Sequence, residues 1–106
     1  MAKYLIQANY VGEGIKGLLK EGGSARRAAV EKLLASVGGK VDSFYYAFGD
    51  TDAYVIVDAP DDVTVAGVAL TVGASGLVTV KTTVLMTPEE VDQATKKSPA
   101  YRAPGA

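Results

Sequence analysis

The chain contains no cysteine and no histidine. Disulfides, thiolate metal sites and cysteine nucleophiles are therefore excluded. The side chain that most often serves as a near-neutral acid or base and as a metal ligand is also missing. Any catalysis would depend on carboxylates, lysine or tyrosine with shifted pKa values, or on a cofactor. Nothing in the sequence indicates a metal site or a cofactor, and we expect neither.

The chain also lacks an excess of charge of either sign. Its 11 basic and 12 acidic residues give a net charge of −1, which provides no long-range field for nucleic acid or an anionic membrane. No apolar run approaches the ~20 residues that a membrane span requires. The first residues, MAKYLIQANY, do not resemble a signal peptide. We expect a cytoplasmic protein without a nucleic-acid or membrane partner.

Hydrophobic residues make up 48% of the 106 residues, and many recur periodically along the chain. This length and composition suit one domain with one core. Alternation predicts strands, whereas apolar residues three and four apart predict helices. The predicted strands are 3–10, 40–48, 53–59 and 77–86. The predicted helices are a short turn at 15–19, then 25–37, 63–74 and a short segment from 88 to about 96. Their expected N-caps are Ser24, Asp61 or Asp62, and Thr87.

This order predicts an α+β, ferredoxin-like βαββαβ fold with a short C-terminal helix. Two helices would cover one face of a four-stranded antiparallel sheet, residues 1–96 would form the domain, and residues 97–106 a surface tail. The uncovered face would mix apolar with polar side chains, which is typical of sheets that pack against a second copy. We therefore expect a homo-oligomer of the dimeric α/β-barrel type. The alternative is a monomer whose tail covers this face with Tyr101.

Four stretches carry a resemblance to a known family: ANYVGEGIKGLLK, SARRAAVEKLLASVGGKV, FYYAFGDTDAYVIVDAPDD and GASGLVTVKTTVLMTPEEVD. Together they resemble the GYD domain family, which consists of small bacterial proteins grouped with the dimeric α/β-barrel folds. The resemblance extends from Lys3 to about Lys96 of this chain. The family's Gly-x-Tyr-Asp signature aligns with Gly49-Asp50-Thr51-Asp52, so Thr51 stands at the tyrosine position. The resemblance implies the fold and the assembly but no established activity.

The acidic residues around the signature are a first candidate site. In an extended strand at ~3.3 Å per residue, Asp58 would lie about 20 Å from Asp52. These acids therefore do not converge locally. We expect Asp50 and Asp52 to accept hydrogen bonds from turn amides instead.

The stretch GGSARR offers a second candidate, an anion site formed by Ser24, Arg26 and Arg27 at a helix N-terminus. The alternative is a solvated helix face on which Arg27 pairs with Glu31.

The third candidate is a ligand site on the uncovered sheet face, formed by Gln7, Asn9, Tyr10, Tyr54 and Lys81. In a dimer cleft the lysine could bind an acidic ligand, or serve as a base if desolvation lowers its pKa.

Two functions remain open at this point. The first is a non-catalytic, homo-oligomeric module that binds a small molecule or a partner protein. The second is a small cofactor-free oxygenase or isomerase with an apolar pocket at the sheet face, and it rests on fold analogy alone.

Overall fold

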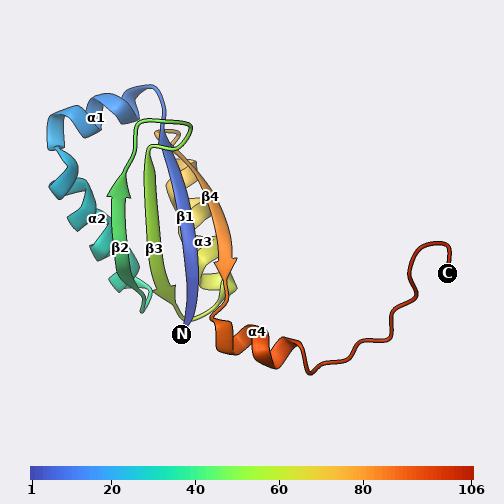
Figure 1. Cartoon of the computed structure of the whole chain (residues 1–106). Helices are drawn as coiled ribbons and strands as arrows, with labels where there is room; N and C mark the ends of the chain where they lie inside the picture. Colours follow the sequence, from blue (N-terminus) through green and yellow to red (C-terminus); the bar gives the residue numbers. More distant parts are fainter.

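Four strands form one antiparallel sheet in the order β2-β3-β1-β4, in a computed structural model that describes residues 1–106 (Figure 1). The strands are β1 (Ala2–Tyr10), β2 (Lys40–Tyr46), β3 (Ala53–Ala59) and β4 (Val78–Leu85). The helices are α1 (Glu13–Glu21), α2 (Gly23–Ser36), α3 (Asp62–Ala74) and α4 (Pro88–Ala94). This arrangement confirms the predicted α+β, ferredoxin-like fold.

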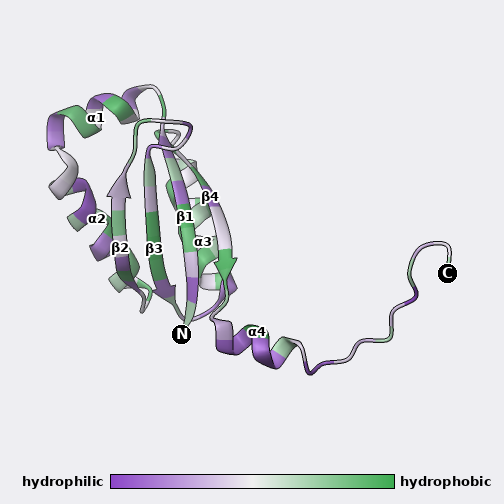
Figure 2. Cartoon of the chain, viewed as in Figure 1, coloured by the Kyte–Doolittle hydropathy of each residue, from purple (hydrophilic) through white to green (hydrophobic).

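The core lies between the sheet and the helices α2 and α3. Strict alternation in β1 turns Tyr4, Ala8 and Tyr10 toward the helices, as predicted for the first two. The neighbouring β3 turns its valines and alanines the same way, and Val57 is completely buried. Leu34 of α2 and Val65 of α3 pack against these residues. The middle of β3 is hydrophobic, whereas the other strands and the helices α1, α2 and α4 mix hydrophobic with hydrophilic residues (Figure 2).

The helix caps agree with the sequence in two places and differ in a third. Asp61 caps α3 by accepting from the Thr64 amide, a hydrogen bond that also lowers the pKa of the Asp61 carboxyl. Thr87 and Glu90 form the predicted capping box of α4. The expected Ser24 cap was wrong, because α2 begins at Gly23, two residues earlier than predicted, with Gly22 as an N-cap that has no side chain.

The first helix, α1, is longer than the single turn that the sequence predicted. It packs against the start of β4, where the backbone amide of Val11 donates to the Leu77 carbonyl at 3.0 Å. A Cβ at Gly14 would lie 2.0 Å from this same carbonyl oxygen. Only glycine therefore allows α1 to lie so close to the strand.

Beyond β4 the chain leaves the sheet. Every residue from Met86 to Ala106 is exposed, and α4 and the tail extend away from the body of the molecule (Figure 1). Tyr101 lies in this tail and does not cover the sheet face, as the monomeric alternative would require. No helix has both the length and the apolar character needed to cross a membrane.

Candidate functional site

The face of the sheet opposite the helices has no element over it in this chain. We call it the open face. It consists of the side chains that alternate away from the core, and successive cross-strand pairs arrange them in rows. These residues are Lys3, Leu5, Gln7, Asn9, Lys40, Asp42, Ser43, Tyr45, Tyr54, Ile56, Asp58, Thr79, Lys81, Thr83 and Leu85.

One row crosses all four strands. Tyr45 pairs with Tyr54, Tyr54 with Gln7, and Gln7 with Lys81. The two tyrosines are 71% and 40% exposed. The structure thus brings together four of the five predicted ligand-site residues, namely Gln7, Asn9, Tyr54 and Lys81.

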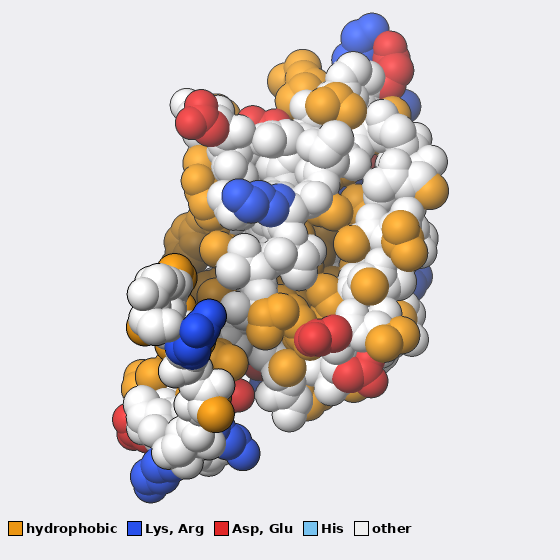
Figure 3. All heavy atoms as spheres, turned by 90° about the vertical axis from the view of Figure 1, so that its right-hand side faces the viewer, with side chains coloured by type: hydrophobic (Ala, Val, Ile, Leu, Met, Phe, Trp, Pro, Cys, Tyr) orange, Lys and Arg blue, Asp and Glu red, His pale blue; other side chains and the backbone are white.

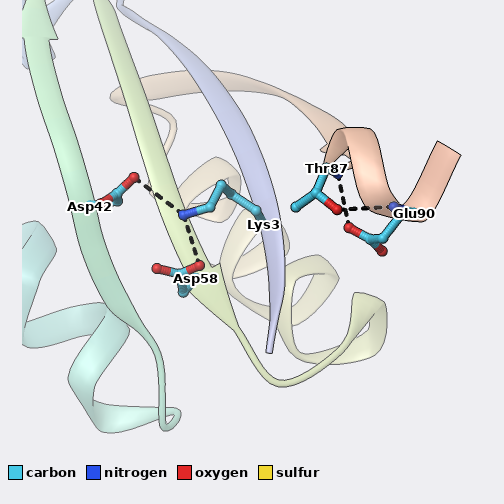
Figure 4. Close-up of polar contacts among 5 residues, drawn as sticks. All are labelled: Lys3, Asp42, Asp58, Thr87 and Glu90. Carbon is cyan, nitrogen blue, oxygen red and sulfur yellow. Dashed lines mark hydrogen bonds and ion pairs between the residues drawn. The ribbon is translucent and has the colours of Figure 1, made fainter. Parts of the chain in front are cut away.

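A second row, of charged side chains, lies near the N-terminal end of β1, where Lys3 reaches Asp42 and Asp58 (Figure 4). The ammonium group of Lys3 forms ion pairs with Asp58 at 3.0 Å and with Asp42 at 3.2 Å. The hydrogen bonds to Asp58 and to Asp42 raise the pKa of Lys3 above its ordinary value. From the sequence we considered Asp58 together with the acidic residues of the turn, but its carboxylate forms an ion pair with Lys3.

The signature turn is anchored to the end of β1. Asp52 accepts a hydrogen bond from the backbone amide of Tyr10 at 2.9 Å, and its own amide donates to Asn9 Oδ1 at 2.9 Å and to the Ala8 carbonyl at 3.0 Å. Thr51, at the signature tyrosine position, accepts from Gln7 Nε2 at 3.4 Å. The carboxylate of Asp52 therefore links the turn to β1, and Asp50 accepts no hydrogen bond, so the expectation that both accept from turn amides was wrong.

A shallow polar hollow of about 330 Å³ lies where the turn meets the open face. Its lining includes Gln7, Asn9 and Lys81 from the sheet, together with Asp50 and Thr51 from the turn. Lys81 has no carboxylate within ion-pair distance in its own chain, unlike Lys3. The hollow can therefore offer an amide, a hydroxyl and an unpaired ammonium to a ligand.

Tyr10, the fifth predicted ligand-site residue, lies on the other side of the sheet. It is even-numbered like Tyr4 and Ala8, and alternation turns all three toward the helices. The signal that separates Tyr10 from Gln7 and Asn9 is therefore present in the sequence.

The predicted anion-site residues also separate. Arg27 points outward and pairs with Glu31 at 3.9 Å, the arrangement that the alternative predicted. Arg26 turns inward, beside Tyr10. Ser24 is exposed in the first turn of α2. No group of three or more carboxylates is placed to hold a metal ion.

The sheet order, the open face and the anchored turn define a ferredoxin-like α+β protein with one uncovered sheet surface. A sequence model of the GYD domain matches residues 4–95, and the chain belongs to the GYD domain family. Comparison with curated proteins and with solved structures finds no match.

Proposed function

We propose that the protein is a small homo-oligomeric binding module, in which the open face of one copy packs against the open face of a second. The observation that carries this proposal is the uncovered central row, with Tyr45 and Tyr54 exposed beside the apolar pair of Leu5 and Ile56. A two-fold axis brings the same patch of both copies together, so one mixed surface can complement itself.

The chain exposes more surface than a compact monomer of its mass does. A compact monomer of 11.0 kDa exposes about 5,600 Å², whereas this chain exposes 7296 Å². The excess of about 1,700 Å² includes the extended C-terminal residues, and a stable interface needs about 800 Å² from each partner. Figure 3 shows the molecule from the side of β4, at a right angle to Figure 1, and hydrophobic side chains lie among polar and charged ones on that side.

Oligomeric state is the direct test. Tyr54→Lys places a charge in the middle of the open face, and Leu70→Lys places the same charge on the outer surface of α3, where Leu70 is already exposed. We expect light scattering after size exclusion to show a dimer or a higher oligomer for the unmodified chain and for Leu70→Lys, and a shift toward monomer for Tyr54→Lys. A chain that is monomeric at every concentration tested would refute the proposal.

The polar hollow supports a second role within such an assembly, the binding of a small acidic ligand through Lys81. Closure by a second copy would remove water from the hollow and strengthen the attraction between the ammonium and an anion.

The proposal of an oxygenase or isomerase at this face has less support, because Val80 is the only apolar residue that lines the hollow. A thermal-shift screen of organic acids tests the role of Lys81 in binding an acidic ligand. It compares Lys81→Gln with the control Lys96→Gln, which lies on the exposed C-terminal segment. A shift that survives Lys81→Gln would exclude this role.

A further inference from the structure

We propose that the helix side of the sheet holds a separate small-molecule site, which binds a monocarboxylate with an apolar body. The site is a cleft of about 260 Å³ between the sheet and the two long helices. Its floor includes Ala8 and Ala53, its walls include Val30 and Val72, and its only charged side chain is Arg26. This proposal goes beyond the assembly through the open face and does not depend on it.

The cleft exists because small residues meet on the two inner strands of the sheet, near the end where the signature turn lies. Ala8 and Ala53 are directly opposed on neighbouring strands, and both are buried. The helix α2 lies over β2, and α3 lies over β4 and β3, so neither helix fills the space above this alanine pair. Two methyl groups thus stand where larger side chains would close the core.

The size and lining of the cleft suit an apolar body. An engineered apolar cavity of ~150 Å³ stays dry and binds benzene, so about 260 Å³ admits one aromatic ring with a short chain. The cleft is partly open, which gives such a molecule a route of entry. Sugars and polyanions are disfavoured, because their polar groups would find no partners along the alanine and valine walls.

The polar end of the cleft consists of hydrogen-bond donors. Arg26 lies there with Tyr10, which is 9% exposed. The neighbouring Tyr46 donates its only hydroxyl proton to the Gly23 carbonyl at 3.0 Å. The Tyr46 oxygen then accepts from the hydroxyl of Tyr10. The guanidinium of Arg26 can donate to a ligand, and the Tyr10 hydroxyl can turn its proton from Tyr46 to that ligand, which must accept at this end.

An anionic acceptor fits these donors best. No carboxylate lines the apolar cleft, and the one ion pair of Arg26, with Glu21, is long at 3.8 Å. Glu21 and Glu13 line an adjoining groove of about 250 Å³, which shares Tyr10 and Arg26 with the cleft. A carboxylate can replace Glu21 at the guanidinium and form two parallel hydrogen bonds.

The test is a titration of the full-length chain with 3-phenylpropanoate, followed by two-dimensional amide NMR spectra. We expect saturable shifts at Ala8 and Ala53. The corresponding alcohol, 3-phenylpropanol, should bind at least tenfold more weakly, because it lacks the charge that Arg26 recognises. Acetate should bind more weakly still, because it lacks the apolar body. Equal affinity for acid and alcohol, or the absence of saturable shifts at the alanine pair, would overturn the proposal.

Two matched pairs of variants locate the site. Arg26→Gln should weaken binding about tenfold, whereas Arg27→Gln, one residue away and outward, should leave it unchanged. Ala29→Leu places extra volume at the mouth of the cleft and should block binding, whereas Ala28→Leu, which does not line the cleft, should not. All four positions accept good helix formers, so the variants should fold. Equal effects within either pair would contradict the assignment.

Assembly and this site can be separated experimentally. Tyr54→Lys should alter the oligomeric state and leave the affinity for 3-phenylpropanoate unchanged, because Tyr54 lies on the opposite face of the sheet from the cleft. Loss of the shifts at Ala8 in that variant would contradict the independence of the two surfaces.

Discussion

The signature aspartate gives the sharpest stability prediction. Asp52→Ala removes the carboxylate that accepts from the Tyr10 amide at 2.9 Å. The backbone hydrogen bonds of residue 52, to Ala8 and from Ala47, do not involve the side chain and should persist. The substitution therefore isolates one contact between the turn and β1.

The magnitude follows from the charge and the burial of this contact. A hydrogen bond to a charged group contributes about 1.5–3 kcal/mol when its loss leaves the donor unsatisfied. Asp52 is half-buried, so water can reach part of the vacated space, and we expect a loss of about 2 kcal/mol in the free energy of unfolding. For a domain of this size, that corresponds to a decrease in melting temperature of roughly 10 °C.

The assay is urea unfolding followed by circular dichroism, with Asp50→Ala as the matched control. Asp50 lies in the same turn, is exposed and accepts no hydrogen bond, so its substitution should change stability by less than about 0.5 kcal/mol. Asp52→Asn keeps an acceptor oxygen and should lie between the two. If Asp50→Ala and Asp52→Ala cost the same, the anchoring role of Asp52 is wrong.

Three further predictions concern the core and the helices. Tyr4 donates to Asp62, and this hydrogen bond, together with burial, raises the pKa of Tyr4 from 10.0 to about 12. The unfolded chain therefore ionises first, so the stabilisation is complete below pH 10 and is lost toward pH 12. Alkaline absorbance titration should show one less late-ionising tyrosine in Tyr4→Phe. Leu34→Ala, at a side chain 1% exposed, should cost about 3 kcal/mol in urea unfolding. Thermal melts should show that Gly14→Ala destabilises the protein, because its methyl would meet the Leu77 carbonyl. Gly17→Ala, with open space around it, should be stabilising by up to about 1 kcal/mol.

Period-two patterning made the sheet predictable. In β1 the alternation of large and small apolar residues with polar ones assigned Gln7 and Asn9 to the open face before any pairing was known. The same rule applied to the last residue of the strand assigns Tyr10 to the core. We predicted Tyr10 as an aromatic wall of the open-face site together with Tyr54, and the structure places it on the core side with Ala8.

Contacts between distant segments could not be predicted in this way. The carboxylate of Asp52 reaches the amide of a residue 42 positions earlier, and local spacing can propose only neighbouring turn amides as partners. The start of α2 depends on Gly22 and Gly23, and a Cβ at Gly23 would lie 2.9 Å from the ring of Tyr46. This close packing favours an early start over a Ser24 cap. The cleft depends on the register that opposes Ala8 to Ala53, which no single strand reveals.

The two sides of the sheet meet at Tyr10. Its amide is fixed by Asp52, and its ring lines the helix-side cleft. Asp52→Ala should therefore also weaken the binding of 3-phenylpropanoate, measured well below the melting temperature, by releasing the strand end that positions the Tyr10 hydroxyl. Tyr10→Phe removes that hydroxyl, so the effect of Asp52→Ala should be much smaller in the Tyr10→Phe background. Simple additivity of the two substitutions would show that the signature aspartate stabilises the turn without positioning the ligand.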